Sequence, residues 1–296
     1  MPKQKRNAYL ELHFSVILFG FTAILGRLIE MSEYEIVWYR LLITSLSLLL
    51  WPGAIKAIIN MPKIKLVKLL GVGIIVSMHW LCFYGSIKAS NVTVALSTFA
   101  VTSLFTSIIE PLYFKEKFSN SNLFLGLFVI PGMYLIYSFG NGYHTGILLG
   151  LCAALLAAVF STLNRKLVRD TNPIHLTLME LGSGWIFISL LFPFVSSYFP
   201  NATFVPSAMD FAYLLILALL CTSVAYVVSN HSLRQLSAFT ATLTVNLEPV
   251  YGIILAWLIF SENKEVGYEF YLGTFIILLS VFLHPFLERR FHKQTN

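Results

Sequence analysis

Residues 148–160 read LLGLCAALLAAVF, and this stretch decides which kind of fold the chain can adopt. It holds no charged side chain, and its residues do not alternate between apolar and polar as they would in a strand of a membrane β-barrel. The surrounding range 143–164 is long enough to cross a bilayer as a helix, which takes about 20 apolar residues. The stretch therefore predicts a membrane-spanning helix.

The composition of the whole chain agrees with this prediction. Of its 296 residues, 57% are hydrophobic and 11% are charged, whereas an average soluble domain has roughly 25% charged residues. A water-soluble fold could not cover its surface with so few polar groups, so lipid is the expected environment. The net charge of +6 comes from short basic clusters between apolar runs, not from one basic face, so we expect no nucleic-acid partner.

Nine further apolar runs, each bounded by charged residues, Pro or Asn, resemble the first. The resulting prediction is an all-α integral membrane protein whose ten transmembrane helices cover residues 8–29, 34–55, 67–88, 91–114, 121–140, 143–164, 174–197, 210–233, 237–260 and 267–287. A helix pairs its backbone N–H and C=O groups within itself, which is necessary because hydrocarbon offers them no hydrogen-bond partners.

The distribution of Lys and Arg predicts the orientation of these spans. With the N-terminus in the cytoplasm, 16 of the 20 basic residues fall in cytoplasmic segments, three (Arg27, Lys88 and Lys264) fall on the opposite side, and Arg40 falls within a span. Short cytoplasmic loops retain positive charge. We therefore expect a multi-pass protein of the cytoplasmic membrane with both termini in the cytoplasm, which requires an even number of spans.

An internal repeat appears at a spacing of 146 residues. It aligns Ser86-Ile87-Lys88 with Ser232-Leu233-Arg234, and it aligns FKEKFS (residues 114–119) with FSENKE (residues 260–265). Each half, residues 1–140 and 141–296, then contains five spans. Because five is odd, the second half enters the membrane from the opposite side, which is the inverted repeat of many secondary transporters.

These residues resemble the drug/metabolite transporter superfamily and, within it, the EamA-type transporters with ten helices in two repeats. The endings of the fourth helix of each half, FKEKFS and FSENKE, are similar to the family's pattern, as is NLEPVYGIILAWLIFSE (residues 246–262). VWYR (residues 37–40) resembles the family's second helix. The resemblance covers nearly the whole chain.

The resemblance implies a substrate path along the pseudo-twofold axis and transport of a small metabolite, driven by a gradient. One departure is Ser103, which stands where the second half and the family's usual repeat have a proline, here Pro249. This departure argues against identical movements of the two halves.

Glu248 is the leading candidate for substrate binding or coupling. It lies eleven residues into its predicted helix, about 16 Å from the cytoplasmic end, and an ionisable group at this depth usually faces a cavity or the protein interior. Pro249 follows it and is expected to kink the helix and expose backbone groups beside the carboxyl. A buried structural hydrogen bond is the alternative role.

His79 lies near the middle of another span, followed by Trp80, with Tyr84 about one turn later. As a lone histidine it is also explained by packing. A proton is the coupling ion that we consider, with Glu248 and His79 as its carriers, because burial raises the proton affinity of a carboxyl and His titrates near neutrality.

Arg40 and Glu180 are candidate gate residues on opposite sides of the membrane. Arg40 lies about six residues inside the outer end of its helix, and Glu180 lies about as far inside the inner end of the corresponding helix of the other half. Each could instead extend along its helix to the nearer interface. Glu110 is close to Lys115 and Lys117, so either an ion pair with them or extension to the cytoplasmic interface explains it.

Other polar and aromatic residues complete the predicted path. Asn246 and Tyr226 are the favoured lining residues, with Asn91, Thr98, Thr102 and Thr244 behind them, since such groups also join helices by hydrogen bonds. Trp38 and Tyr39 are candidate site aromatics.

A small-molecule carrier is the favoured function, and we expect an amino acid or a related polar compound to be exported. A drug or nucleotide-sugar carrier is the alternative. A channel would need a ring of selectivity groups, and a membrane-embedded enzyme would need a reactive constellation, whereas Asp170 and Asp210, the two aspartates, lie in loops. The three cysteines lack metal-binding spacing, so we expect neither a metal nor a cofactor.

Overall fold

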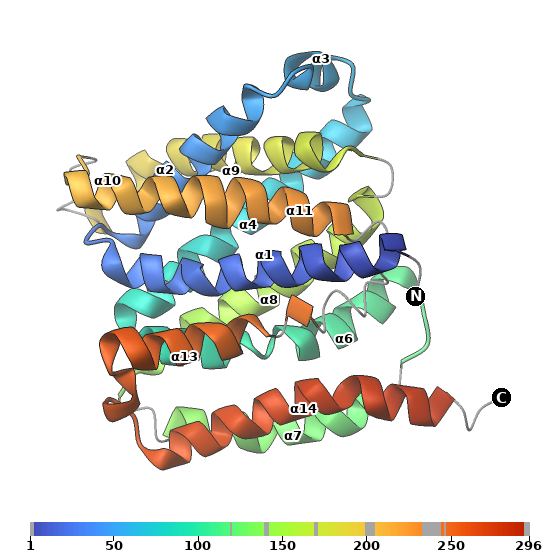
Figure 1. Ribbon diagram of the computed structural model, residues 1–296, viewed down its shortest axis with the longest axis vertical. Coiled ribbons are helices and arrows are strands. Elements are labelled where there is room, and N and C mark those ends of the chain that lie inside the picture. The colour runs from blue at the N-terminus through green and yellow to red at the C-terminus, as the bar shows by residue number, and fades with distance from the viewer. Residues whose placement is uncertain are drawn as a thin grey trace.

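The computed structural model describes residues 3–118, 120–138, 142–168, 171–198, 205–232, 244–245 and 247–292. Within these ranges every regular element is helical, and most helices lie side by side in one bundle (Figure 1). This confirms the all-α class. The elements are α1 (Lys3–Leu28), α2 (Glu33–Leu49), α3 (Ala54–Ile59), α4 (Lys63–Ala89), α5 (Val92–Phe99), α6 (Thr102–Phe114), α7 (Asn120–Ser138), α8 (His144–Leu167), α9 (Pro173–Val195), η2 (Ser196–Tyr198), α10 (Ala208–Leu215), η3 (Ile216–Val224), α11 (Ala225–Ser232), α13 (Glu248–Phe260), η4 (Glu262–Lys264) and α14 (Tyr268–His292).

Several of these helices have the length and composition needed to cross a membrane. In the described part of the chain, six segments are long and apolar enough, namely Arg6–Leu28, Lys63–Ala89, Val92–Phe114, His144–Leu167, Pro173–Tyr198 and Ala208–Ser232. Three shorter apolar helices, Val129–Ser138, Glu248–Phe260 and Tyr268–Leu279, fall within further predicted spans. The helix α2, with 17 residues, overlaps the first part of the remaining predicted span, 34–55.

The helix α2 ends earlier than predicted. It starts after Ser32, whose side chain and that of Glu35 cap each other's backbone N–H groups, and it ends at Leu49, not at residue 55. Pro52 disfavours helix in the residue before it. Gly53 then adopts a φ of 83°, and the short helix α3 follows.

The predicted span 91–114 is broken, which corrects the expectation of one continuous helix. It consists of α5 and α6, separated by Ala100 and Val101. No proline causes the break. Instead, the Thr98 hydroxyl donates to the carbonyls of Val94 and Ala95, and the Thr102 hydroxyl donates to Phe99, so side chains compete with the regular helical ladder.

Pro249 also differs from the expectation, because it does not kink the middle of a described helix. The helix α13 begins at Glu248, so Pro249 lies in its first turn, where a missing N–H leaves no helical hydrogen bond unmade. In Figure 1, α6 and α13 lie at the same level, α13 toward the left end of the bundle and α6 toward the right.

Small residues let the central helices approach closely. A Cβ on Gly73 of α4 would lie 2.0 Å from the Glu180 carbonyl oxygen of α9, and one on Gly150 of α8 would lie 2.0 Å from the Thr98 hydroxyl. Ala153, Ala154, Ala157 and Ala158 of α8 are all buried. No hydrophobic effect drives helices together in lipid, so the close van der Waals packing that glycine and alanine allow stabilises such crossings.

The bundle has two ends. The Glu262 end is where α1 and α13 finish and where α2, α5 and α10 begin, on the left of Figure 1. The Arg165 end is the opposite one, where α6, α8 and α11 finish and α9 begins. The helices α7 and α14 pack along each other at the bottom of the same view, beside the rest of the bundle.

Candidate functional site

Arg40 lies inside the bundle and is held by neutral groups. Its side chain is 2% exposed. Its Nε donates to the Thr222 hydroxyl at 2.7 Å, and its Nη1 donates to the Tyr84 hydroxyl, also at 2.7 Å. The guanidinium carbon lies 3.8 Å from the centre of the Trp80 ring, a cation–π contact. No carboxylate in the described part of the chain forms an ion pair with it.

The local structure explains why Trp80, Tyr84 and Thr222 converge on Arg40. Trp80 and Tyr84 are four residues apart on α4 and therefore share a face. Gly26 of α1 leaves room for the Tyr84 ring, which would lie 2.4 Å from a Cβ there. Thr222 belongs to η3, a π-helical segment in which its hydroxyl donates to the carbonyl of Leu217 at 2.7 Å. Its lone pairs thus remain available to accept from Arg40.

Glu248 faces the same site from α13. It is 7% exposed and lies in the first turn of that helix, where unpaired N–H groups and the helix dipole favour a negative charge. Its charge interacts with that of Arg40. The two groups are not an ion pair, however, and Glu248 makes no hydrogen bond to any described residue. The Glu248 carboxyl and the Arg40 guanidinium thus share one buried region without direct contact.

Tyr226 of α11 borders this region. Its ring meets that of Trp80 edge to face at 5.9 Å between centroids, and meets that of Phe19 at 5.5 Å. Its hydroxyl interacts electrostatically with Arg40, Glu180 and Glu248. Five of the residues singled out in the sequence, Arg40, Trp80, Tyr84, Tyr226 and Glu248, therefore come together.

His79 points elsewhere. Its Nδ1 lies 2.8 Å from the carbonyl oxygen of Ala153, which makes Nδ1 the donor, and its ring packs on those of Phe83, Phe99 and Phe160. This is the surrounding of a packed neutral imidazole.

Trp38 and Tyr39 lie on the side of α2 that faces α9. The Trp38 indole donates to the Ser189 hydroxyl at 2.9 Å, and its ring packs against Trp185 and Tyr39. Neither ring stacks on Arg40. Asn246, the other favoured lining residue, lies outside the described residues. Thr98 is buried with its hydroxyl bonded to its own helix, and Asn91 caps α5.

Glu180 occupies a second polar site, toward the Arg165 end. It is fully buried, and its Oε2 accepts from the Asn164 side-chain amide at 3.2 Å. Its other oxygen, Oε1, and the Asn164 Oδ1 are buried and have no hydrogen-bond partner among the described residues. The alternative that Glu180 extends to the interface does not agree with this burial.

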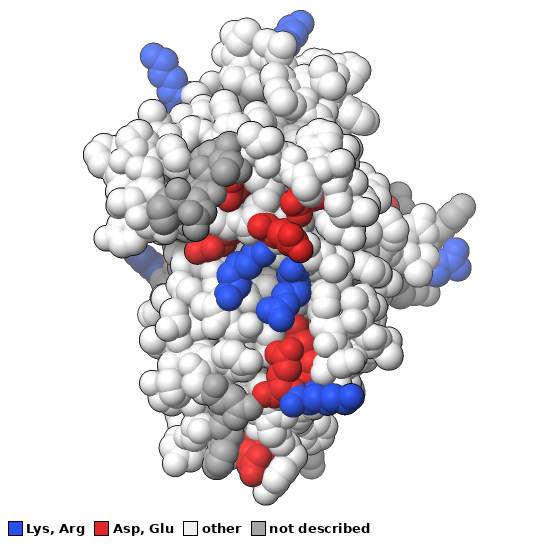
Figure 2. Space-filling model, turned by 90° about the vertical axis from the view of Figure 1, so that its left-hand side faces the viewer, with Lys and Arg blue, Asp and Glu red and all other residues white. Residues whose placement is uncertain are grey.

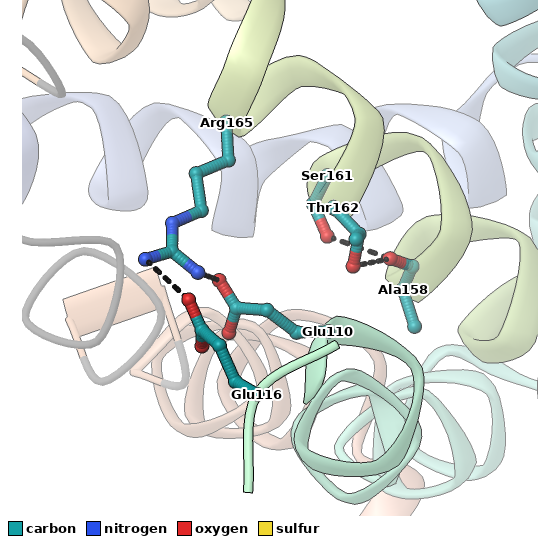
Figure 3. A network of polar contacts seen from close by, with 6 residues as sticks. All are labelled: Glu110, Glu116, Ala158, Ser161, Thr162 and Arg165. Atoms are coloured by element: carbon teal, nitrogen blue, oxygen red, sulfur yellow. Dashed lines mark hydrogen bonds and ion pairs between the residues drawn. The ribbon is translucent and has the colours of Figure 1, made fainter. Parts of the chain in front are cut away.

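Glu110 forms an ion pair, but its partner differs from the one expected. Arg165 of α8, not Lys115 or Lys117, donates to Glu110 at 2.6 Å, with Glu116 at 3.9 Å (Figure 3). In the same view, the hydroxyls of Ser161 and Thr162 point to the Ala158 carbonyl of their own helix. The Arg165 group also lies over the Phe114 ring at 4.7 Å.

Sequence reasoning missed Thr222 and Asn164. Thr222 lies in an apolar run, and only the pair Thr222-Ser223 signals hydroxyls at membrane depth. Asn164 immediately precedes Arg165-Lys166 and reads as the end of a helix. In the described ranges, no three His, Cys, Asp or Glu residues are placed to hold a metal ion together.

Comparisons with known proteins identify a family and agree with the fold. The model of the EamA-like transporter family matches residues 7–138 and 144–284. The chain is similar to the "Uncharacterized transporter YxxF" of Bacillus subtilis, at 25% identity over 86% of this chain and 82% of that one. It is also similar to an "Uncharacterized transporter" of Haemophilus influenzae, at 25% identity over 88% and 90%. A crystal structure with 13% identity superposes with a TM-score of 0.66 over 97% of this chain and 99% of that chain, which supports the fold alone.

Proposed function

Because the chain belongs to the EamA-like transporter family and is a multi-pass membrane transporter, we propose that it is a secondary active carrier which exports an amino acid or a related zwitterionic metabolite. The observation that carries this proposal is the buried pair Arg40 and Glu248, which interact electrostatically without forming an ion pair. A solute carboxylate would bind Arg40, and a solute ammonium would bind Glu248.

The partners of Arg40 favour a carboxylate ligand. A guanidinium has five N–H donors, and two hydroxyls accept from only two of its nitrogens, Nε and Nη1. Its Nη2 has no acceptor in the described part of the chain. A planar carboxylate is the group that a guanidinium binds best, through two parallel hydrogen bonds. The Trp80 face beneath Arg40 fixes the guanidinium plane without neutralising its charge.

We further propose ten spans in two inverted five-helix halves, residues 1–140 and 141–296, with both termini in the cytoplasm and alternating access between the halves. The broken span 91–114 and the start of α13 support this arrangement, because Thr102 and Glu248, the first residues of α6 and α13, are 146 apart, which is the spacing of the repeat. Substrate sites of such carriers lie at discontinuous helices.

Cysteine labelling tests the orientation. Asn60→Cys should be labelled from inside only and Asn263→Cys from outside only, and the reverse pattern would overturn the orientation.

The test of the solute class is a thermal-shift and counterflow screen on the purified protein. The panel contains L-amino acids, their methyl esters, their N-acetyl derivatives, lipophilic cations and nucleotide sugars. We expect stabilisation and counterflow by free amino acids, and weaker effects from both derivatives because each lacks one charge. Preference for lipophilic cations or nucleotide sugars would overturn this class in favour of the alternative carriers.

Matched variants test which residue binds which charged group of the solute. Glu248→Gln should abolish the advantage of free amino acids over N-acetyl derivatives, because no carboxylate remains for the ammonium. Arg40→Gln should abolish the advantage over methyl esters. Glu110→Gln, which changes a carboxylate near the end of α6, should leave both preferences unchanged. Identical selectivity in Glu248→Gln and the wild type would contradict the assignment, as would covalent conversion of any panel compound.

A further inference from the structure

The Glu180–Asn164 pair lacks a hydrogen-bond donor. A carboxylate and an amide oxygen together can accept several hydrogen bonds, yet the single one here joins Glu180 Oε2 to Asn164 Nδ2 at 3.2 Å. Glu180 Oε1 and Asn164 Oδ1 remain buried without a partner. An ionised carboxylate left in this state would carry a desolvation cost of several kcal/mol.

No cation compensates Glu180 from the helices around it. Charged or titratable groups on α2, α3, α4, α8 and α11 include Arg40, Lys56, Lys68, Arg165, Tyr226 and His231. Arg40 is bonded to Tyr84 and Thr222, Arg165 to Glu110, and His231 to Glu11. None of the described basic groups forms an ion pair with Glu180, and Tyr226 is the titratable group that interacts with it electrostatically.

We propose that Glu180 is a proton-binding site, separate from the Arg40–Glu248 site, and that its protonation couples transport to a proton gradient. A neutral carboxyl requires no cation. Turning the Asn164 amide by 180° places Oδ1 where Nδ2 lies, 3.2 Å from Glu180 Oε2, so that Oδ1 accepts from an O–H on that oxygen. One proton therefore removes the uncompensated charge of Glu180 and gives Asn164 Oδ1 a donor, while Oε1 remains as the carbonyl oxygen of a neutral carboxyl.

The surroundings link this proton to the solute site. The Tyr226 hydroxyl interacts with Glu180 and also with Glu248 and Arg40, so a charge on Glu180 changes the electrostatic field at the bound solute. The backbone carbonyl of Glu180 also lies against Gly73 at the crossing of α4 and α9. Hydration of an ionised Glu180 requires these helices to separate, which is a movement toward opening of the Arg165 end. This coupling role rests on the proposed carrier function.

The proton itself is tested without any solute. Infrared difference spectra of the full-length protein in liposomes, titrated with pH, should contain a band from a buried protonated carboxyl that is lost in Glu180→Gln. Glu180→Asp should retain a shifted band, and the control Glu110→Gln should retain the band unchanged. An unchanged band in Glu180→Gln would overturn the proton site.

The coupling is tested with labelled L-amino acids in the same liposomes. Glu180→Gln should keep counterflow at equal pH but lose the acceleration that a pH gradient gives the wild type, and Glu180→Asp should recover it. Acceleration of Glu180→Gln by the pH gradient would overturn the coupling, as would acceleration of the wild type by a sodium gradient alone. If the wild type exchanges no amino acid, the proposed solute is wrong, while the infrared result still decides whether Glu180 binds a proton.

Discussion

The helices α13 and α6 finish in the same backbone conformation at opposite ends of the bundle, Ser261 with a φ of 57° and Lys115 with a φ of 56°. A glutamate follows each of them. At the Glu262 end, Glu262 is fully buried and accepts from the N–H groups of Val92 at 3.1 Å and Thr93 at 2.7 Å. At the Arg165 end, the Glu116 side chain is 54% exposed, 3.9 Å from Arg165.

Further hydrogen bonds also join segments at the Glu262 end. At the Glu262 end, Asn91 donates to Glu265 at 2.6 Å, and the Glu30 N–H donates to Asp210 at 2.9 Å, so loops from both halves are joined. Figure 2 shows this end, where the acidic side chains and several of the basic ones lie along one strip down the middle of the face. The difference teaches that one sequence pattern, F-x-E at residues 114–116 and 260–262, can place its glutamate in a buried, hydrogen-bonded position at one end of the bundle and in an exposed position at the other.

The largest expected effect comes from removing the buried carboxylate. Glu262→Ala leaves the Val92 and Thr93 N–H groups without acceptors in a buried place, which costs roughly 2–4 kcal/mol. The matched variant Glu116→Ala removes an exposed carboxylate at the corresponding position and should cost under about 0.5 kcal/mol. Thermal and denaturant unfolding in detergent measures both.

The ranking of these two variants decides whether the ends differ. Equal destabilisation would show that the two glutamates have equivalent roles and would remove the basis of the comparison. Glu262→Gln, which retains a side-chain acceptor, should recover part of the loss. If it instead unfolds as readily as Glu262→Ala, the negative charge at the start of α5 matters more than the hydrogen bonds.

Much of this comparison was accessible from sequence, and some of it was not. The repeat placed Glu116 and Glu262 at corresponding positions, and the spans placed Glu248 and Arg40 at membrane depth. Which N–H groups Glu262 accepts from depends on the packing of α13 against α5, which no local pattern encodes. The break at Ala100–Val101 was missed for a similar reason, because hydroxyls at Thr98 and Thr102 produce it without a proline. The partner of Arg40, Thr222, depends on a π-helical turn that only the three-dimensional structure reveals.

A second pair of variants sharpens the comparison at the start of two helices. Asn91 caps α5 and is fully buried, whereas Asn172 caps α9 at the Arg165 end and is exposed, its Oδ1 accepting from the Ile174 N–H at 2.9 Å. Asn91→Ala should cost about 2 kcal/mol, because it removes both the cap of α5 and a hydrogen bond to Glu265 in a buried place. Asn172→Ala should cost about 0.5 kcal/mol, since water replaces the lost acceptor. A larger loss from Asn172→Ala in the same unfolding assay would reverse the proposed order.

Of the three contrasts, the one within the ion pairs of Arg165 is expected to be the smallest. The side chains of Arg165 and Glu110 are 29% and 22% exposed, so water and salt screen their attraction. Glu110→Gln should cost about 0.5–1 kcal/mol at low ionic strength and less in 1 M salt, while Glu116→Gln, at 3.9 Å, should be close to neutral. The loss of stability in Glu262→Ala should stay the same in this salt series, because the Glu262 carboxylate accepts hydrogen bonds from buried backbone N–H groups. Salt dependence of Glu262→Ala equal to that of Glu110→Gln would place both glutamates in similar, solvated surroundings and contradict the buried position of Glu262.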